Sequence, residues 1–161
     1  MARPRITAEQ AEALRIIERR VAPTGCVWAI TGSIAFALQG LDFTPEDIDL
    51  QTDREGAFQL EAALSEFMIE PVRLRESERI RSYFGAAEIK NIRVEIMGDL
   101  QKRLPTGEWT EPTDVARHRR WIEWEGIRLP VLSLRYEYEA YSMLGRKETA
   151  GKLRAWLDRP G

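Results

Sequence analysis

Hydrophobic residues recur at helical spacing near both ends of the chain and at strand-like spacing between them. Thr7 to Gln10 form a capping box, which predicts a first helix that ends at Pro23 to Gly25. Helical spacing returns from Leu134 to Leu144 and from Arg146 to Leu157. The pattern therefore predicts helices at both ends of the molecule.

Strands are expected in the middle of the chain. Val27 to Ile30 is a continuous apolar run that predicts a buried strand, and Ile34 to Gln39 then has the pattern of a short helix. Apolar and acidic residues alternate from Asp47 to Gln51, as they do in a strand that shows two faces. Asp53 is placed to cap a further helix that runs through Phe67.

Two hairpins are predicted in the second half. Lys90-Asn91 makes a two-residue turn between strands at 81–89 and 92–97. Glu125-Gly126 separates a second pair, at 119–124 and 127–131. Early alternation of helix and strand, followed by hairpins, predicts an α+β fold with a mixed central β-sheet flanked by helices.

One domain is expected for 161 residues, because that length suits a single hydrophobic core. We expect this domain to span 1–161, with a core at about 25–132 and C-terminal helices at about 133–158. Apolar runs fall far short of the roughly 20 residues that a membrane helix needs. The N-terminus has no apolar signal-peptide segment, so a cytoplasmic location without membrane attachment is expected.

The charge balance narrows the classes of partner and metal. The net charge is −2, with 24 basic and 26 acidic residues, whereas a general nucleic-acid binder normally carries a basic excess. Nucleic acid is therefore an unlikely partner. With only Cys26 and His118 as soft ligands, a zinc site of the usual kind is excluded. Any metal must be held by carboxylates, which favours a hard ion such as Mg²⁺.

Four residues after the predicted first strand, two at the start of the short helix and two on the acidic strand, have the chemistry of a phosphate and metal site. Gly32 lets the backbone approach a ligand, and Ser33 stands where a helix begins, which attracts phosphate. Asp47 and Asp49 lie two apart on a strand, so they share one face. Two such carboxylates repel each other unless a cation lies between them, which predicts a magnesium site.

Glu95 is the expected third acid of this site. Ile92, Val94 and Ile96 define one face of its predicted strand and leave Glu95 on the other. If this strand lies beside the one that carries the two aspartates, the three carboxylates converge. Glu95 would then bind the metal or accept a proton from an attacking hydroxyl. Asp99 competes for this role, although Gly98 indicates that the strand has already ended.

These residues resemble the signature of the nucleotidyltransferase superfamily, whose fold is shared by small antibiotic-modifying nucleotidyltransferases and DNA polymerase β. A hydrophobic residue and a Gly-Gly or Gly-Ser pair precede a short helix, and Asp-hydrophobic-Asp and a later acid follow. The matching segments are 30–33, 47–49 and Glu95. The segment from Arg128 to Ser133, together with 145–148, resembles the closing part of lincosamide-type and minimal nucleotidyltransferases.

The resemblance implies transfer of a nucleoside monophosphate, usually AMP from ATP, to an acceptor hydroxyl. Asp47 and Asp49 would hold Mg²⁺, and Glu95 would be the general base or a further metal ligand. Gly32 and Ser33 would hold the β and γ phosphates of ATP or another nucleoside triphosphate. The acceptor would be a small hydroxylated molecule, such as an antibiotic, or a protein.

The chain departs from the family pattern at three places. Phe43 to Glu46 stands where an arginine is common, Ser33 replaces the second glycine, and Glu95 replaces the more usual aspartate. A noncatalytic protein of the same fold, binding a nucleotide or a partner protein as in a toxin–antitoxin pair, is therefore the alternative. A short chain has little room for an acceptor domain, so the acceptor would use the C-terminal helices or a second subunit of a homodimer.

Five basic residues are left with open roles. Arg79, Arg81 and Arg93 either form a basic face that receives the triphosphate or are ordinary solvated strand residues. Arg146 and Lys147 open the last predicted helix, where they either contact phosphate or acceptor or are simply exposed.

Overall fold

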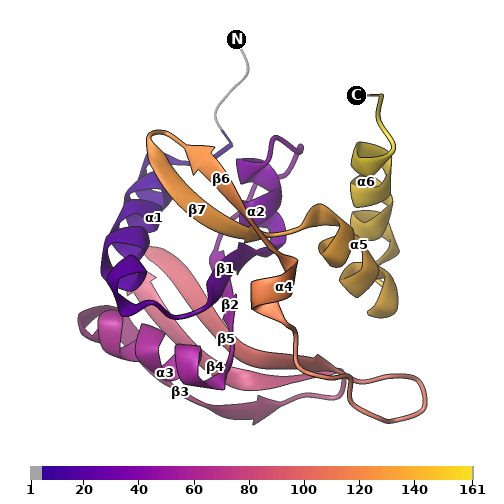
Figure 1. Cartoon of the computed structure of the whole chain (residues 1–161), viewed down its shortest axis with the longest axis horizontal. Helices are drawn as coiled ribbons and strands as arrows, with labels where there is room; N and C mark the ends of the chain where they lie inside the picture. Colours follow the sequence, from indigo (N-terminus) through magenta and orange to yellow (C-terminus); the bar gives the residue numbers. More distant parts are fainter. Residues whose placement is uncertain (1–4, 161) are drawn as a thin grey trace.

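A mixed seven-stranded sheet in the order β3-β4-β5-β2-β1-β7-β6 runs through the computed structural model, which describes residues 5–160 (Figure 1). β1 pairs with β7 and β2 with β5 in parallel, and the other neighbouring pairs are antiparallel. The strands are β1 (Trp28–Thr31), β2 (Ile48–Thr52), β3 (Met68–Glu76), β4 (Ile80–Ile89), β5 (Ile92–Lys102), β6 (Arg119–Trp124) and β7 (Ile127–Leu132). The predicted mixed sheet with flanking helices is confirmed.

Helices cover the two faces of the sheet unequally (Figure 1). α1 and α3 lie on one side, while α5 and α6 pack together on the other side. The helices are α1 (Ala8–Val21), α2 (Gly32–Leu38), α3 (Arg54–Ala63), α4 (Val115–His118), α5 (Leu134–Met143) and α6 (Lys147–Leu157), with 3-10 turns at Ala22–Thr24 and Ser65–Phe67. Within residues 5–160, none of the helices has the length and apolar character needed to cross a membrane.

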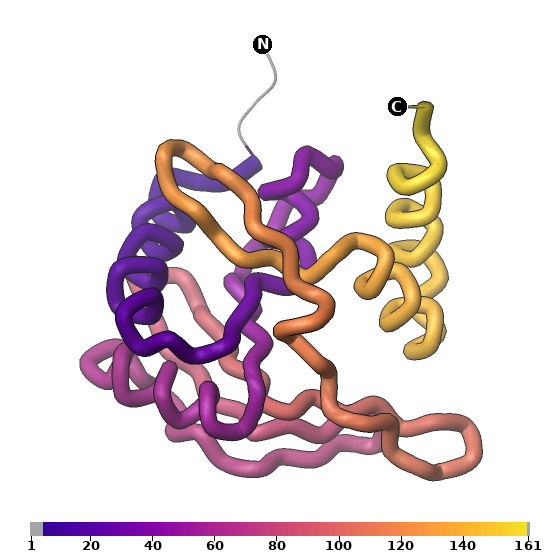
Figure 2. The backbone as a smooth tube through the Cα atoms, in the orientation of Figure 1, coloured from indigo at the N-terminus to yellow at the C-terminus, as the bar shows by residue number. Residues whose placement is uncertain are grey.

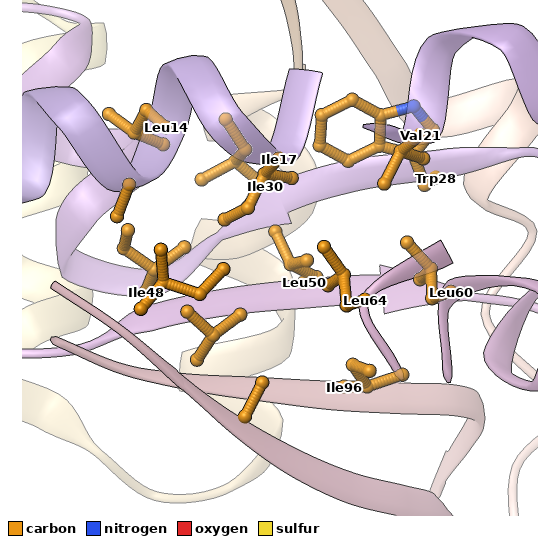
Figure 3. Close-up of a cluster of buried hydrophobic side chains, with 14 of the residues drawn as sticks. Leu14, Ile17, Val21, Trp28, Ile30, Ile48, Leu50, Leu60, Leu64 and Ile96 are labelled. Carbon is orange, nitrogen blue, oxygen red and sulfur yellow. The ribbon is translucent and has the colours of Figure 1, made fainter. Parts of the chain in front are cut away.

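The main hydrophobic core fills the space between the sheet and the α1/α3 layer (Figure 3). Ile48, Leu50 and Ile96 point into it and are fully buried. Because side chains alternate across a strand, the residues between them point to the opposite face. Asp49 and Glu95 are therefore on the face away from this core, where α5 and α6 leave part of the sheet uncovered.

Local sequence signals set the ends of the helices. The Thr7 hydroxyl accepts from the Gln10 amide at 3.1 Å, and the Gln10 side chain accepts from the Thr7 amide at 2.9 Å, so the predicted capping box is confirmed. Asp53 caps α3 through the Gly56 amide at 2.6 Å. Each such cap typically contributes about 1 kcal/mol.

Both predicted hairpin turns are confirmed. Lys90 and Asn91 have φ angles of 53° and 64°, and Glu125 and Gly126 have φ angles of 45° and 84°. Two consecutive positive φ values are typical of the tight turn whose twist matches that of the flanking strands.

Strand ends are where the predictions were least accurate. β5 continues through Gly98 to Lys102, whereas the sequence suggested an end at Gly98. A glycine is needed there because a Cβ would lie 2.7 Å from the Asp53 carbonyl oxygen. Asp99 has a φ of 50°, and a register shift of β4 against β5 between Arg81 and Tyr83 lies opposite it.

Three further elements differ from expectation. α3 ends at Ala63, and only the short 3-10 turn follows it as far as Phe67. β3 and α4 were not predicted at all. β3 is an edge strand in which only Val72 is buried, so apolar and polar residues do not alternate clearly along it. Its pairing with β4 is what makes this segment a strand. The loop between β5 and α4 projects from the sheet (Figure 2).

Candidate active site

Two of the predicted acids are held side by side by the central strands. Asp49 lies within β2 and is in register with Glu95 on the parallel neighbour β5. Asp47 stands just before β2, two residues from Asp49. The sequence placed the three carboxylates together only on condition that these strands are neighbours, and the strands are neighbours.

The pKa values of both aspartates are raised at this site. Burial, the charges of Glu95, Asp47 and Glu137, and a hydrogen bond with Glu95 together raise the pKa of Asp49 to about 7. Burial and the charge of Glu95 also raise the pKa of Asp47, against the opposing effect of Arg93. Negative charge at this point of the sheet is therefore poorly compensated by the protein itself.

Arg93 is the one of the three open arginines that lies at the acids. Its Nε donates to Glu95 Oε2 at 2.9 Å, and its Nη2 donates to Glu70 Oε2 at 3.1 Å. Arg79 instead donates to the Leu144 carbonyl oxygen and Arg81 to the Gln101 side chain. Arg93 thus fixes the orientation of the Glu95 carboxylate, a contact that the sequence analysis did not foresee.

Gly32 leaves room for Asp49. A Cβ at Gly32 would lie 2.9 Å from Asp49 Oδ2, and the φ of 74° is one that side-chain-bearing residues rarely adopt. The Gly32 amide points away from the aspartate and donates to Glu137 Oε2 at 2.8 Å. Of the two residues predicted to hold phosphate, Ser33 is therefore the one whose amide is not engaged by Glu137.

Glu137 is a site residue that the sequence analysis missed. It lies on α5, is only 2% exposed, and also accepts from the Thr31 hydroxyl, at 2.9 Å and 2.8 Å to its two oxygens. Burial raises its pKa to about 7, against the lowering effects of the bonds from Gly32 and Thr31 and of the Lys102 charge. Its sequence neighbours are charged and aromatic and give no signal of a buried acid.

Tyr141 and Arg146 bring the C-terminal helices to the same place. The Tyr141 hydroxyl lies 3.9 Å from the Cβ position of Gly32, and burial together with the Glu137 charge raises its pKa to about 12. The Arg146 guanidinium lies 5.5 Å from the centre of the Tyr141 ring. Arg146, which the sequence left as either a phosphate contact or exposed charge, thus lies over the ring of Tyr141, whose hydroxyl is close to Gly32.

The donor set suits a hard divalent cation. Carboxylate oxygens with raised pKa values are short of a counter-charge, and Gly32 keeps the space beside Asp49 open. No group of three or more His, Cys, Asp or Glu side chains arranged to hold an ion is present among residues 5–160. Because Arg93 already binds Glu95, Asp47 and Asp49 are the better candidates for cation ligands. Mg²⁺ usually takes one or two carboxylates together with substrate phosphates.

Comparisons with known proteins bear on the family and the fold. Residues 13–155 match the sequence profile of the aminoglycoside-2''-adenylyltransferase family. No protein of curated function matches the chain by sequence. The fold is similar to that of a candidate nucleotidyltransferase from Thermotoga maritima, at 47% identity over 95% of both chains and a TM-score of 0.84.

Two antibiotic-modifying enzymes share the fold at low identity. ANT(2'')-Ia in complex with adenylyl-2''-tobramycin has a TM-score of 0.57 and 15% identity over 92% of this chain and 89% of that one. The lincosamide antibiotic adenylyltransferase LnuA, bound to lincomycin, has a TM-score of 0.56 and 11% identity over 92% of this chain and 97% of that one.

Proposed function

The chain belongs to the aminoglycoside-2''-adenylyltransferase family, and we propose that it is a magnesium-dependent enzyme that transfers AMP from ATP to an acceptor hydroxyl. Nucleotidyl transfer is the activity of the family. The nucleotide, the metal and the acceptor are the parts that we propose for this chain.

The observation that carries the proposal is the position of Asp49. It faces Glu95 across two parallel strands, its pKa is raised to about 7 by burial and neighbouring acids, and Gly32 leaves the adjacent space free. Such an accumulation of negative charge destabilises the protein when no cation is bound to it. A divalent cation bound with a nucleoside triphosphate would offset it.

Each acid has a separate role in this proposal. Asp47 and Asp49 would hold the cation, which when bound supplies charge neutralisation along the triphosphate. Glu95 would accept the proton of the acceptor hydroxyl as that oxygen attacks the α-phosphorus and pyrophosphate leaves. Arg93, bound to Glu95 at 2.9 Å, would keep the Glu95 carboxylate oriented for this task.

Phosphate binding falls to Ser33 and Arg146 in this scheme. The Gly32 amide is already donated to Glu137, which leaves the Ser33 amide and hydroxyl at the turn. Arg146, 5.5 Å from the centre of the Tyr141 ring, would supply a positive charge to the phosphates. Gly32 itself would contribute clearance rather than a hydrogen bond.

The acceptor is proposed to be a small hydroxylated molecule, because ANT(2'')-Ia and LnuA are both described with antibiotics or their adenylylated products. A cavity of about 510 Å³ lies beside α5, but Asp47, Asp49 and Glu95 do not line it, so we do not assign it to the acceptor. Arg117, Arg120 and Arg135 are among its lining residues. A homodimer would be one way to complete the acceptor site, and a protein acceptor remains the alternative substrate.

Calorimetry with Mg²⁺ and ATP tests the proposal most directly. The wild-type protein should bind ATP only in the presence of Mg²⁺, and Asp47→Asn/Asp49→Asn should abolish that binding. Glu123→Gln is the matched control, because it removes one carboxylate from β6 at the far edge of the sheet. A screen of acceptors with ATP labelled at the α-phosphate would follow.

Absence of binding by the folded wild-type protein, with GTP, CTP and UTP also tested, would contradict the proposal. The noncatalytic alternative, a protein of this fold that binds a partner protein, would then be the better account. Nucleotide binding by the wild-type protein without transfer to any acceptor would favour a nucleotide-binding protein without catalysis.

A further inference from the structure

A buried carboxylate joins α5 to the turn between β1 and α2. Glu137 Oε2 accepts from the Gly32 amide at 2.8 Å, and its two oxygens lie 2.9 Å and 2.8 Å from the Thr31 hydroxyl. Thr31 and Glu137 are 5% and 2% exposed. Burial of a carboxylate is costly even when it is hydrogen-bonded, so its presence here calls for an explanation beyond packing.

The position of these bonds supplies that explanation. Thr31 is the last residue of β1 and Gly32 the first of α2, so both bonds fall on the residues where the chain turns from strand to helix. Gly32 has a φ of 74°, a region in which a glycine is free to move to other conformations. The hydrogen bond from its amide to Glu137 removes that freedom. It also fixes the position of Ser33, the next residue of α2.

Thr31 extends the network across the sheet. It is in register with Asp49 on the antiparallel neighbour β2, and its hydroxyl accepts from Gln51 Nε2 at 3.4 Å. Gln51 is 5% exposed, and its Oε1 has no hydrogen-bond partner in the part of the chain that the structure describes. One buried polar chain thus connects α5, the turn and the strand that carries Asp49.

We propose that Glu137 is a positioning residue, which through Thr31 and Gly32 holds the strand-to-helix turn in the conformation that leaves Asp49 and Ser33 accessible to a nucleoside triphosphate. Glu137 is enclosed beneath the turn and does not touch the nucleotide. It acts by preorganising the groups that do. The inference rests on the proposed function, because it assigns Glu137 to the same nucleotide site.

Paired substitutions separate positioning from packing. Glu137→Leu removes both acceptor oxygens, and Thr31→Val removes the hydroxyl while keeping the shape of the side chain. Glu137→Gln keeps a carbonyl oxygen for the Gly32 amide, and Thr31→Ser keeps the hydroxyl. We expect at least tenfold weaker binding of Mg²⁺ with α,β-methylene ATP for the first two variants, and binding within about threefold of wild type for the conservative pair.

Thr113→Val is a matched control for a structural effect. Thr113 is 7% exposed, and its hydroxyl pairs with the Tyr136 hydroxyl of α5 at 2.7 Å, away from the Gly32 turn. This variant loses a buried hydroxyl that bonds to the same helix, α5. It should lower the melting temperature about as much as Thr31→Val and leave nucleotide affinity unchanged.

Amide exchange gives a readout that does not need the nucleotide. The amide hydrogens of residues 32 and 33 should exchange faster in Glu137→Leu and Thr31→Val than in wild type, with no such change in Thr113→Val. If Glu137→Leu unfolds, Thr31→Val carries the test.

Wild-type affinity in Thr31→Val, with unchanged exchange at the turn, would overturn the inference. Equal loss of affinity in Thr31→Val and Thr113→Val would also overturn it, because stability alone would then explain the effect. Failure of the wild-type protein to bind Mg²⁺ and nucleotide is a different result, and it would contradict the proposed function itself.

Discussion

Asp49 and Glu95 occupy the same register on two adjacent parallel strands, and the charge of Glu95 helps to raise the pKa of Asp49, although the two acids are far apart in the sequence. Nothing in the strands forces this pairing of like charges. Each residue could be neutral without loss to the hydrophobic core, because both point to the face opposite Ile48 and Ile96. The relationship is therefore a feature of the site rather than of packing.

Asp49→Asn should abolish metal-dependent nucleotide binding and yet stabilise the metal-free protein. At pH 8 the wild-type carboxylate is ionised, although burial and its acidic neighbours oppose ionisation by raising its pKa to about 7. A neutral side chain of the same size removes that penalty, for an expected gain of up to about 4 kcal/mol in the free energy of unfolding. Urea unfolding without Mg²⁺ measures the gain. An unchanged or lower stability would contradict the assigned cause.

Magnesium affinity should rise with pH up to about 7 and then level off. A proton on Asp49, whose pKa is about 7 in the metal-free protein, competes with the cation for the same oxygens. Below that pH, each unit should weaken binding by as much as about tenfold. Calorimetric titration of Mg²⁺ with α,β-methylene ATP at several pH values measures the slope. A flat profile between pH 5 and 8 would exclude Asp49 as a ligand.

Gly32→Ala should lose nucleotide binding because the added Cβ displaces Asp49. Gly25→Ala is the control for the effect of backbone strain alone. Both Gly32 and Gly25 have positive φ angles, of 74° and 70°, so alanine strains either position by about 1 kcal/mol. A Cβ at Gly32 also meets Asp49 Oδ2 at 2.9 Å, whereas nothing lies within 4 Å at Gly25. We expect a larger loss of stability for Gly32→Ala, which adds the clash with Asp49, than for Gly25→Ala, and at least tenfold weaker nucleotide binding for Gly32→Ala only. Calorimetry beside thermal unfolding checks both.

Glu137 should make the metal-free protein less stable as pH rises. Its pKa is about 7 in the folded state and 4.5 as an ordinary glutamate, so the folded state binds the extra proton between these values. The associated stability is complete below about pH 4.5 and is lost as pH rises through about 7. A shift of this size corresponds to about 3 kcal/mol.

Glu137→Gln tests this by removing the titrating group while keeping a similar shape. The free energy of unfolding of wild type should fall more steeply between pH 5 and 8 than that of the variant. The acids at Asp47 and Asp49 contribute a slope of the same sign, which persists in both proteins. Parallel pH profiles for the two proteins would contradict the raised pKa of Glu137.

Much of the fold follows from signals that lie close together in the sequence. The Thr7 to Gln10 capping box, the Asp53 cap and the turn at Lys90-Asn91 each depend on residues within a few positions of one another. The shared face of Asp47 and Asp49 likewise follows from the period of a strand. The Gly-Ser and Asp-x-Asp spacing was enough to indicate the family, and the family was confirmed.

Only the tertiary structure decided which distant residues meet. The parallel pairing of β2 with β5 brings Glu95 to Asp49, and the packing of α5 brings Glu137 to Gly32 across 105 positions of sequence. The hydropathy pattern does not predict such contacts, because a glutamate has the same hydropathy whether it is buried and bonded to a turn or exposed to solvent. Periodicity reports the environment along one element, whereas register and helix placement depend on the pairing and packing of the whole chain.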